Sequence, residues 1–178
     1  MNVLLSLAGK IDAINECVGR IVSWVVLGLV LVVFGDVVFR YVFNVSFVFT
    51  QELEWHLFAF IFLMGAGYTL ISDNHVRVDI IYQRLSEKGR AWINLLGCIF
   101  FLFPGCLLVI ITSVPFAYTS FEMLEGSPDP GGIPLRFVLK ACIPLGFTLF
   151  GLQGLSLFLR SLLTVLGHES SDEKKEAR

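Results

Sequence analysis

Charged residues are scarce in this sequence. Only 16% of its 178 residues are Asp, Glu, Lys or Arg, whereas soluble domains contain about a quarter. The net charge of -2 gives no basic surface for binding nucleic acid, so we expect no nucleic-acid partner. Hydrophobic residues make up 56% of the chain and include 17 Phe, and the mean hydropathy is +0.78. These values predict a membrane protein in contact with lipids.

Motifs for metals, cofactors and catalysis are also lacking. The four Cys show no CxxC or other metal spacing, so we expect neither a metal nor a disulfide. His56 is predicted at the opposite membrane face from His75 and His168, which argues against a haem held between facing helices. The chain has no nucleotide-binding glycine motif and no Ser, His and Asp at one depth. We therefore predict that the protein is not an enzyme and has no cofactor.

Four apolar segments are long enough to cross a bilayer, which takes about 20 helical residues. Their predicted ranges are residues 21–43, 53–72, 91–117 and 137–163. Short connections between them predict an all-α, antiparallel four-helix bundle in one membrane domain over residues 1–166, followed by a charged cytoplasmic tail over 167–178. Lys10 follows the first apolar stretch instead of preceding it, so we expect no cleaved signal peptide. Pro104 predicts a kink or tilt in the third segment.

Two further segments have the apolar spacing of amphipathic helices. Residues 3–18 form either a helix along the membrane surface or an extension of the next helix. Residues 75–90 are predicted to form a second interfacial helix, on the cytoplasmic side. The polar residues that we single out in it are His75, Arg77, Asp79 and Arg84.

The distribution of Lys and Arg predicts the orientation of the chain. All but three of the 13 basic residues fall on the side that holds both termini and the connection between the second and third segments. The three exceptions are Arg40, Arg136 and Lys140. Because short cytoplasmic loops are enriched in Lys and Arg, both termini are predicted to be cytoplasmic.

Acidic and basic residues cluster around the turn between the first two segments, where they are costly to place in lipid. Asp36 and Arg40 are spaced i, i+4, so they can pair on one face of a helix. Glu52 and Glu54 follow the turn. We interpret the four residues as a structural clasp that ties the first two helices together. The alternative is a proton or ion relay, which requires an accessible, unpaired carboxylate.

Several motifs resemble those of the small membrane subunit, the DctQ-type or Q subunit, of tripartite ATP-independent periplasmic (TRAP) transporters. The motifs lie in order over about three quarters of the chain. They are Arg40-Tyr-Val-Phe-Asn44, Thr50-Gln-Glu52-Leu, His75-Val-Arg-Val-Asp79, Gly132-Ile-Pro134, and Ile143-Pro144-Leu-Gly146 with Gln153 beyond it. The acidic, proline-rich stretch over residues 122–130 does not match a family motif.

This resemblance implies a location in the bacterial inner membrane and two protein partners. A large permease (M) subunit would hold the sodium and substrate sites and move by an elevator mechanism, while a periplasmic binding (P) protein delivers an organic acid. The small subunit would serve as scaffold and anchor. Sialic acids and C4-dicarboxylates both remain open as substrates. The residues expected to help dock a partner at the periplasmic loops are Asn44, Ser46, Thr50, Glu122, Glu125, Asp129 and Arg136.

Two other functions fit a small four-helix membrane protein. One is a self-sufficient proton-coupled carrier that works as a dimer, with Asp36 or Glu54 as its essential carboxylate. The other is a membrane-bound redox subunit, which a haem absorbance band would reveal. Neighbouring reading frames for a large permease and a secreted binding protein would favour the TRAP hypothesis over both.

Overall fold

The fold is described from a computed structural model, which defines residues 2–71 and 85–167. Every regular element in these two ranges is a helix. The elements are α1 (Asn2–Val42), α2 (Val48–Ile71), α4 (Glu87–Gly97), the π-helix η1 (Cys98–Leu102), α5 (Phe103–Glu122) and α6 (Phe137–Val165). Four helical stretches are long and apolar enough to span a membrane, which confirms the predicted all-α, multi-pass fold.

Helix α1 is continuous over 41 residues, which corresponds to about 60 Å. A bilayer core is only about 30 Å thick, so α1 extends beyond one membrane crossing. Of the two alternatives for residues 3–18, the structure therefore shows the extension of the first spanning helix. Most of the predicted second interfacial helix, including His75, Arg77, Asp79 and Arg84, lies outside the described residues.

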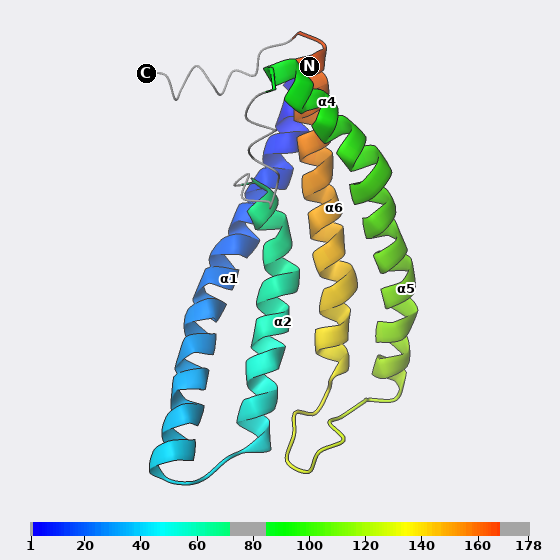
Figure 1. Cartoon of the computed structure of the whole chain (residues 1–178). Coiled ribbons are helices and arrows are strands. Elements are labelled where there is room, and N and C mark those ends of the chain that lie inside the picture. The colour runs from blue at the N-terminus through cyan, green and yellow to red at the C-terminus, as the bar shows by residue number, and fades with distance from the viewer. Residues whose placement is uncertain (1, 72–84, 168–178) are drawn as a thin grey trace.

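The helices lie side by side in the order α1, α2, α6 and α5 (Figure 1). Helix α6 is central, because it packs against α1, α2, α4 and α5, whereas α5 packs mainly against α6. We call the end with the α1–α2 turn (residues 43–47) and the α5–α6 loop (residues 123–136) the loop end. The opposite end, where the N-terminus lies, is the terminal end (Figure 1).

Glycines allow the central helix to approach its neighbours closely. A Cβ atom on Gly146 of α6 would lie 2.5 Å from the backbone oxygen of Leu63 in α2. A Cβ on Gly154 would lie 2.3 Å from the side chain of Leu102 in η1. Lipid offers no hydrophobic force between helices, so close packing at small residues is what holds such helices together.

The third spanning stretch changes its helical geometry immediately before Pro104. Residues Cys98–Leu102 form a π-helical turn, and Pro104 lies in the first turn of α5. Proline has no N–H to donate and its ring crowds the preceding turn, so a wider turn relieves the mismatch. The helix is therefore locally irregular immediately before the proline, and the predicted kink or tilt stays a prediction.

Candidate functional site

The polar groups at the loop end begin with Asp36, whose residue is only 3% exposed. Its carboxylate pairs with Arg40 one turn along α1, as the spacing predicted. The hydroxyl of Thr50, in the first turn of α2, donates a hydrogen bond of 2.9 Å to Asp36 Oδ1. The pair on α1 is therefore tied to α2 through Thr50.

Glu52 has different partners from those that the predicted clasp requires. Its residue is 4% exposed. Its carboxylate accepts hydrogen bonds of 2.5 Å from the hydroxyl of Ser127 and from the backbone N–H of Ile133. The guanidinium of Arg136 lies 3.7 Å from Glu52 Oε1. Glu52 thus fixes the α5–α6 loop to α2 instead of joining Asp36 and Arg40, because the loop supplies it with donors from both backbone and side chains.

Close packing supports this connection. A Cβ atom on Gly132 would lie 2.6 Å from Glu52 Oε2, so only glycine leaves room for the carboxylate at this position. The guanidinium of Arg136 also lies over the ring of Trp55, 5.3 Å from its centroid. Such a cation–π contact adds to the attraction between the loop and α2.

Glu54, the fourth residue of the predicted clasp, is half-buried and makes no hydrogen bond or ion pair with the described part of the chain. His56 Nδ1 donates a hydrogen bond of 2.7 Å to the backbone oxygen of Glu52, while its Nε2 atom is buried without a partner. The predicted clasp is therefore divided. Asp36 and Arg40 act with Thr50, Glu52 acts with the loop, and Glu54 joins neither group.

Glu125 closes the α5–α6 loop onto its flanking helices. Its carboxylate pairs with Lys140 of α6 and accepts a hydrogen bond of 2.6 Å from Ser120 of α5. Its backbone oxygen accepts a bond of 2.8 Å from the Arg136 N–H. The hydrogen bond from Lys140 and then that from Ser120 hold the pKa of Glu125 below its ordinary value. This carboxylate is therefore charged at neutral pH.

Four further residues predicted to dock a partner are exposed at the loop end: Asn44, Ser46, Glu122 and Asp129. Asn44 has a positive φ of 56°, a backbone conformation that Asn tolerates better than most residues. Ser46 accepts a hydrogen bond of 2.7 Å from Gln51. Glu122 is the last residue of α5, and Asp129 is exposed within the α5–α6 loop. Sequence reasoning missed Ser127, Ile133 and Ser120 as partners.

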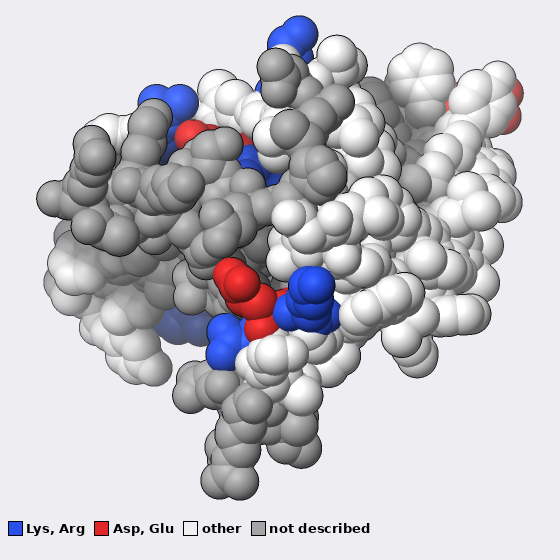
Figure 2. Space-filling model, turned by 90° about the horizontal axis from the view of Figure 1, so that it is seen from above, with Lys and Arg blue, Asp and Glu red and all other residues white. Residues whose placement is uncertain are grey.

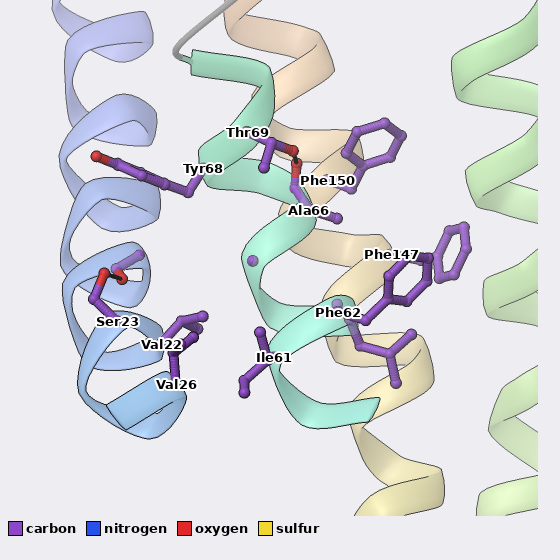
Figure 3. Close-up of a pocket in the computed structure, with 14 residues that line it drawn as sticks. Val22, Ser23, Val26, Ile61, Phe62, Ala66, Tyr68, Thr69, Phe147 and Phe150 are labelled. Atoms are coloured by element: carbon purple, nitrogen blue, oxygen red, sulfur yellow. Dashed lines mark hydrogen bonds between the residues drawn. The ribbon is translucent and has the colours of Figure 1, made fainter. Parts of the chain in front are cut away.

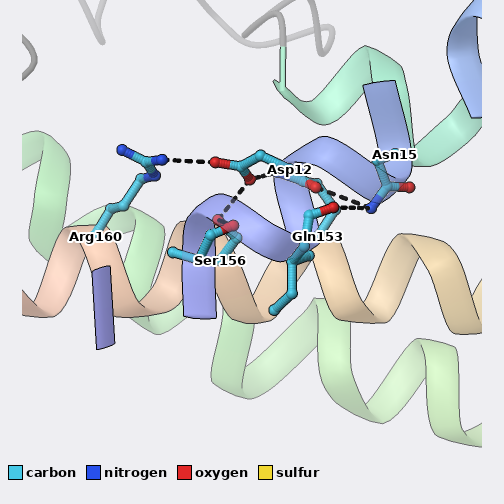
Figure 4. A network of polar contacts seen from close by, with 7 residues as sticks. Asp12, Asn15, Gln153, Ser156 and Arg160 are labelled. Carbon is cyan, nitrogen blue, oxygen red and sulfur yellow. Dashed lines mark hydrogen bonds and ion pairs between the residues drawn. The ribbon is translucent and has the colours of Figure 1, made fainter. Parts of the chain in front are cut away.

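A second polar network, which the sequence analysis did not identify, joins α1 to α6 near the terminal end (Figure 4). The Asp12 carboxylate accepts hydrogen bonds from Gln153 (2.7 Å), Ser156 (2.7 Å) and Arg160 (2.6 Å). Asn15 donates a bond of 3.0 Å to the side-chain oxygen of Gln153. The polar residues spaced about one turn apart on each helix were the sequence signal that could have revealed this network.

Viewed onto this end, Lys and Arg side chains form several separate patches, with acidic side chains beside some of them (Figure 2).

Comparisons with known proteins are consistent with one another. A family model described as tripartite ATP-independent periplasmic transporters, DctQ component, matches residues 29–164. The chain is 26% identical over 161 residues to the ectoine TRAP transporter small permease protein TeaB of Halomonas elongata, which covers 88% of this chain and 81% of that protein. It is 27% identical over 121 residues to a Haemophilus influenzae protein provisionally named a TRAP transporter small permease protein, covering 67% and 66% of the two chains. No solved structure gives a significant match.

Proposed function

The chain belongs to the DctQ family of small TRAP permease subunits, and from this premise we propose that it is the fixed scaffold and membrane anchor of a large elevator-type permease subunit. In this proposal the large subunit carries the sodium and substrate sites. Moving one part of a transporter against another requires that the other part resists displacement. A bundle of four apolar helices embedded in lipid supplies that resistance.

The observation that carries the proposal is that the two buried carboxylates near the loop end are already engaged. Asp36 is held by Arg40 and Thr50, and Glu52 is held by Ser127 and the Ile133 N–H. A carboxylate that relays ions must exchange partners during each cycle. Groups saturated by their own chain are suited instead to holding helices and loops in place.

We further propose that the loop end lies in the periplasm and helps receive the binding protein, with both termini in the cytoplasm of a bacterial inner-membrane protein. The placement of Lys and Arg along the sequence supports this orientation. Glu52 and Glu125 hold the α5–α6 loop in one conformation. A loop that is ordered before contact loses less conformational entropy when it binds a partner.

The proposed cargo is an organic acid imported with sodium. The Halomonas elongata relative is named as part of an ectoine transporter, so ectoine joins sialic acids and C4-dicarboxylates as a compound to test. In this proposal the small subunit does not determine substrate specificity, because the binding protein and the large subunit contact the substrate. The substrate can be identified by copurifying the binding protein and analysing its bound ligand by mass spectrometry.

Glu54 is the observation that favours the second candidate, a proton-coupled carrier, because it is a half-buried carboxylate without a partner in the described residues. We test this with Glu54→Gln in the assembled transporter, with exposed Glu16→Gln as the control. A scaffold predicts that both variants import substrate within about twofold of the wild-type rate. Loss of import in Glu54→Gln alone, with the complex intact, would support the carrier.

A further inference from the structure

A groove of about 510 Å³ lies between α1, α2 and α6 (Figure 3). This volume is within the range of about 300–1,000 Å³ typical of small-molecule sites. The groove is lined on α1 from Gly19 to Val26 and on α2 from Ile61 to Thr69. Both stretches lie in helices that are long and apolar enough to span a membrane. The sites already described, at the loop end and around Asp12, do not include it.

The walls of the groove select an apolar occupant. The Ser23 hydroxyl donates to the backbone oxygen of Gly19 at 3.0 Å, and that of Thr69 donates to the oxygen of Ala66 at 2.8 Å. These hydroxyls are therefore occupied by their own helices. The remaining lining is hydrocarbon apart from Tyr68, and aromatic rings such as Phe62 and Phe147 contribute to it (Figure 3).

The groove has one closed end, toward the terminal end of the bundle. There Tyr68 reaches toward α1 (Figure 3), and its ring occupies the space that a Cβ on Gly19 would need, at 2.4 Å. From Gly19 to Val26 the groove follows about 10 Å of helix toward the membrane interior. This shape suits a narrow chain lying parallel to the helices better than another helix, which is about 10 Å wide.

The residues beside this end mark the level of the lipid headgroups. Trp24 is 75% exposed, and Tyr41, further along the same helix, is 77% exposed. The helix between them is about 26 Å long, close to the thickness of a bilayer core, and exposed Trp and Tyr rings favour both edges of that core. Gly19 lies about 7 Å further out along α1 than Trp24, so the closed end of the groove is at the level of the headgroups, and the groove reaches the hydrocarbon at Val26 and Ile61.

A cation is next in the sequence to this end, just outside the residues that line the groove. Arg20 follows Gly19 directly, is exposed, and makes no ion pair with the described part of the chain. Arginine binds phosphate oxygens through charge-assisted hydrogen bonds. A phospholipid satisfies both features, with its acyl chain in the groove and its phosphate at Arg20.

We propose that the groove between α1, α2 and α6 is a binding site for one membrane phospholipid, with its acyl chain against Val22 and Val26 and its anionic headgroup at Arg20. Lipid tails are as apolar as the groove walls, so burial alone gives the lipid little preference for the site over the bilayer. The preference comes from tight packing and from Arg20. The site therefore favours phosphatidylglycerol, which has a net negative charge, over phosphatidylcholine. The proposal does not depend on the scaffold function.

The test is to count retained lipids. The full chain is reconstituted in nanodiscs of equal parts phosphatidylglycerol and phosphatidylcholine, released into mild detergent and measured by native mass spectrometry. The wild type is expected to retain one phospholipid, mostly phosphatidylglycerol. Arg20→Gln should lower retention of phosphatidylglycerol at least fivefold, while exposed Lys10→Gln, further out on α1, should not.

A groove-filling variant tests the acyl-chain site separately. A Cβ on Gly65 would meet only Val22, at 3.6 Å, so Gly65→Leu places its side chain in the groove without an initial clash. We expect retention of both lipids to fall at least fivefold. The control is Gly28→Leu on α1, outside the groove, where a Cβ has nothing within 4 Å. Circular dichroism checks that both variants keep their helices.

Other outcomes overturn the proposal. If the wild type retains no phospholipid, or if Arg20→Gln and Gly65→Leu both retain as much as the wild type, the groove is not a lipid site. If Gly65→Leu changes the oligomeric state of the chain or its yield with the large subunit while lipid retention stays the same, a protein segment occupies the groove instead. Neither result bears on whether the chain supports transport, which a separate assay measures.

Discussion

Two acidic residues deep in the structure are stabilised in different ways. Asp36 depends on a neighbour one turn away on its own helix and on Thr50 across the turn, whereas Glu52 depends on a loop that follows α5. An unpaired carboxylate in such a place costs several kcal/mol, so the identity of each partner decides whether the residue is tolerated. These contacts make single substitutions informative.

Replacing Arg40 by Ala leaves Asp36 with Thr50 as its only described side-chain partner. Asp36 is buried but Arg40 is 46% exposed, and solvent screens the pair. We therefore expect a loss at the low end of about 1–3 kcal/mol in the free energy of unfolding, together with weaker assembly or weaker binding-protein docking. Denaturation in detergent and the copurification yield measure these effects.

The double variant Asp36→Asn/Arg40→Ala is the control for this prediction. Without the carboxylate, the loss of Arg40 should cost less, and the double-mutant cycle isolates the pair. A variant Arg40→Ala that assembles normally and has lost only its sodium coupling would contradict the structural role of the pair.

Glu125 gives the loop end a dependence on pH. The hydrogen bonds from Lys140 and Ser120 lower its pKa in the folded protein below the ordinary value of 4.5. A lowered folded pKa means that the carboxylate stabilises the fold at pH values above 4.5 and that this contribution disappears as the pH falls through the lowered value. The advantage of the wild type over Glu125→Gln should therefore be constant from about pH 6 to 8 and vanish in stronger acid.

Thermal unfolding of both proteins across this range checks the prediction. Glu122→Gln is the matched control, because Glu122 is exposed at the end of α5 and pairs with nothing in the described residues. Its difference from the wild type should stay small at every pH. An advantage of the wild type over Glu125→Gln that grows on acidification would show that the pair with Lys140 is not the cause.

At the scale of the elements, α6 holds the bundle together through close contacts at small residues. Gly146 allows the backbone of α6 to approach the Leu63 carbonyl, and Gly154 allows Leu102 to pack against it. The Asp12 network joins the extended part of α1 to the last turns of α6. Polar contacts thus hold the extension of α1 against α6, whereas tight packing holds α2 against α6.

Replacing Gly146 by Ala tests the packing between α2 and α6. The added methyl group would lie 2.5 Å from a backbone oxygen, which cannot rotate away as a side chain would. We expect a destabilisation of about 1–3 kcal/mol from overpacking. Gly151→Ala on the same helix is the control, because its nearest neighbour, Cys106, would lie at an ordinary 3.6 Å. Equal unfolding midpoints for the two variants would contradict the close approach.

The sequence predicted those features that depend on local spacing. Hydrophobic length identified the spanning helices, and the i, i+4 spacing predicted the pair of Asp36 with Arg40. It did not predict the partners of Glu52, because Ser127 and Ile133 lie 75 and 81 residues further along the chain. Asp12 and Gln153 are separated by 141 residues. Such contacts depend on the relative rotation and height of packed helices, which the periodicity of one segment does not specify.

At the scale of the whole molecule, the helix packing and the internal polar contacts are consistent with the proposed fixed scaffold. The helices form an apolar array around α6 (Figure 1), the buried acids at the loop end are satisfied internally, and the α5–α6 loop is fixed at both of its ends. A subunit of this kind can support a moving partner without taking part in ion coupling. The phospholipid site would add a contact with the bilayer itself.

The most direct test of the scaffold role is substrate uptake by liposomes that contain the large permease subunit with and without this chain. Both preparations receive the binding protein, a sodium gradient and the ligand identified from the copurified binding protein. We predict rapid uptake by the complex and little uptake by the large subunit alone, at equal amounts of correctly folded large subunit. Equal uptake rates in the two preparations would contradict the proposal that this chain is the scaffold on which transport depends.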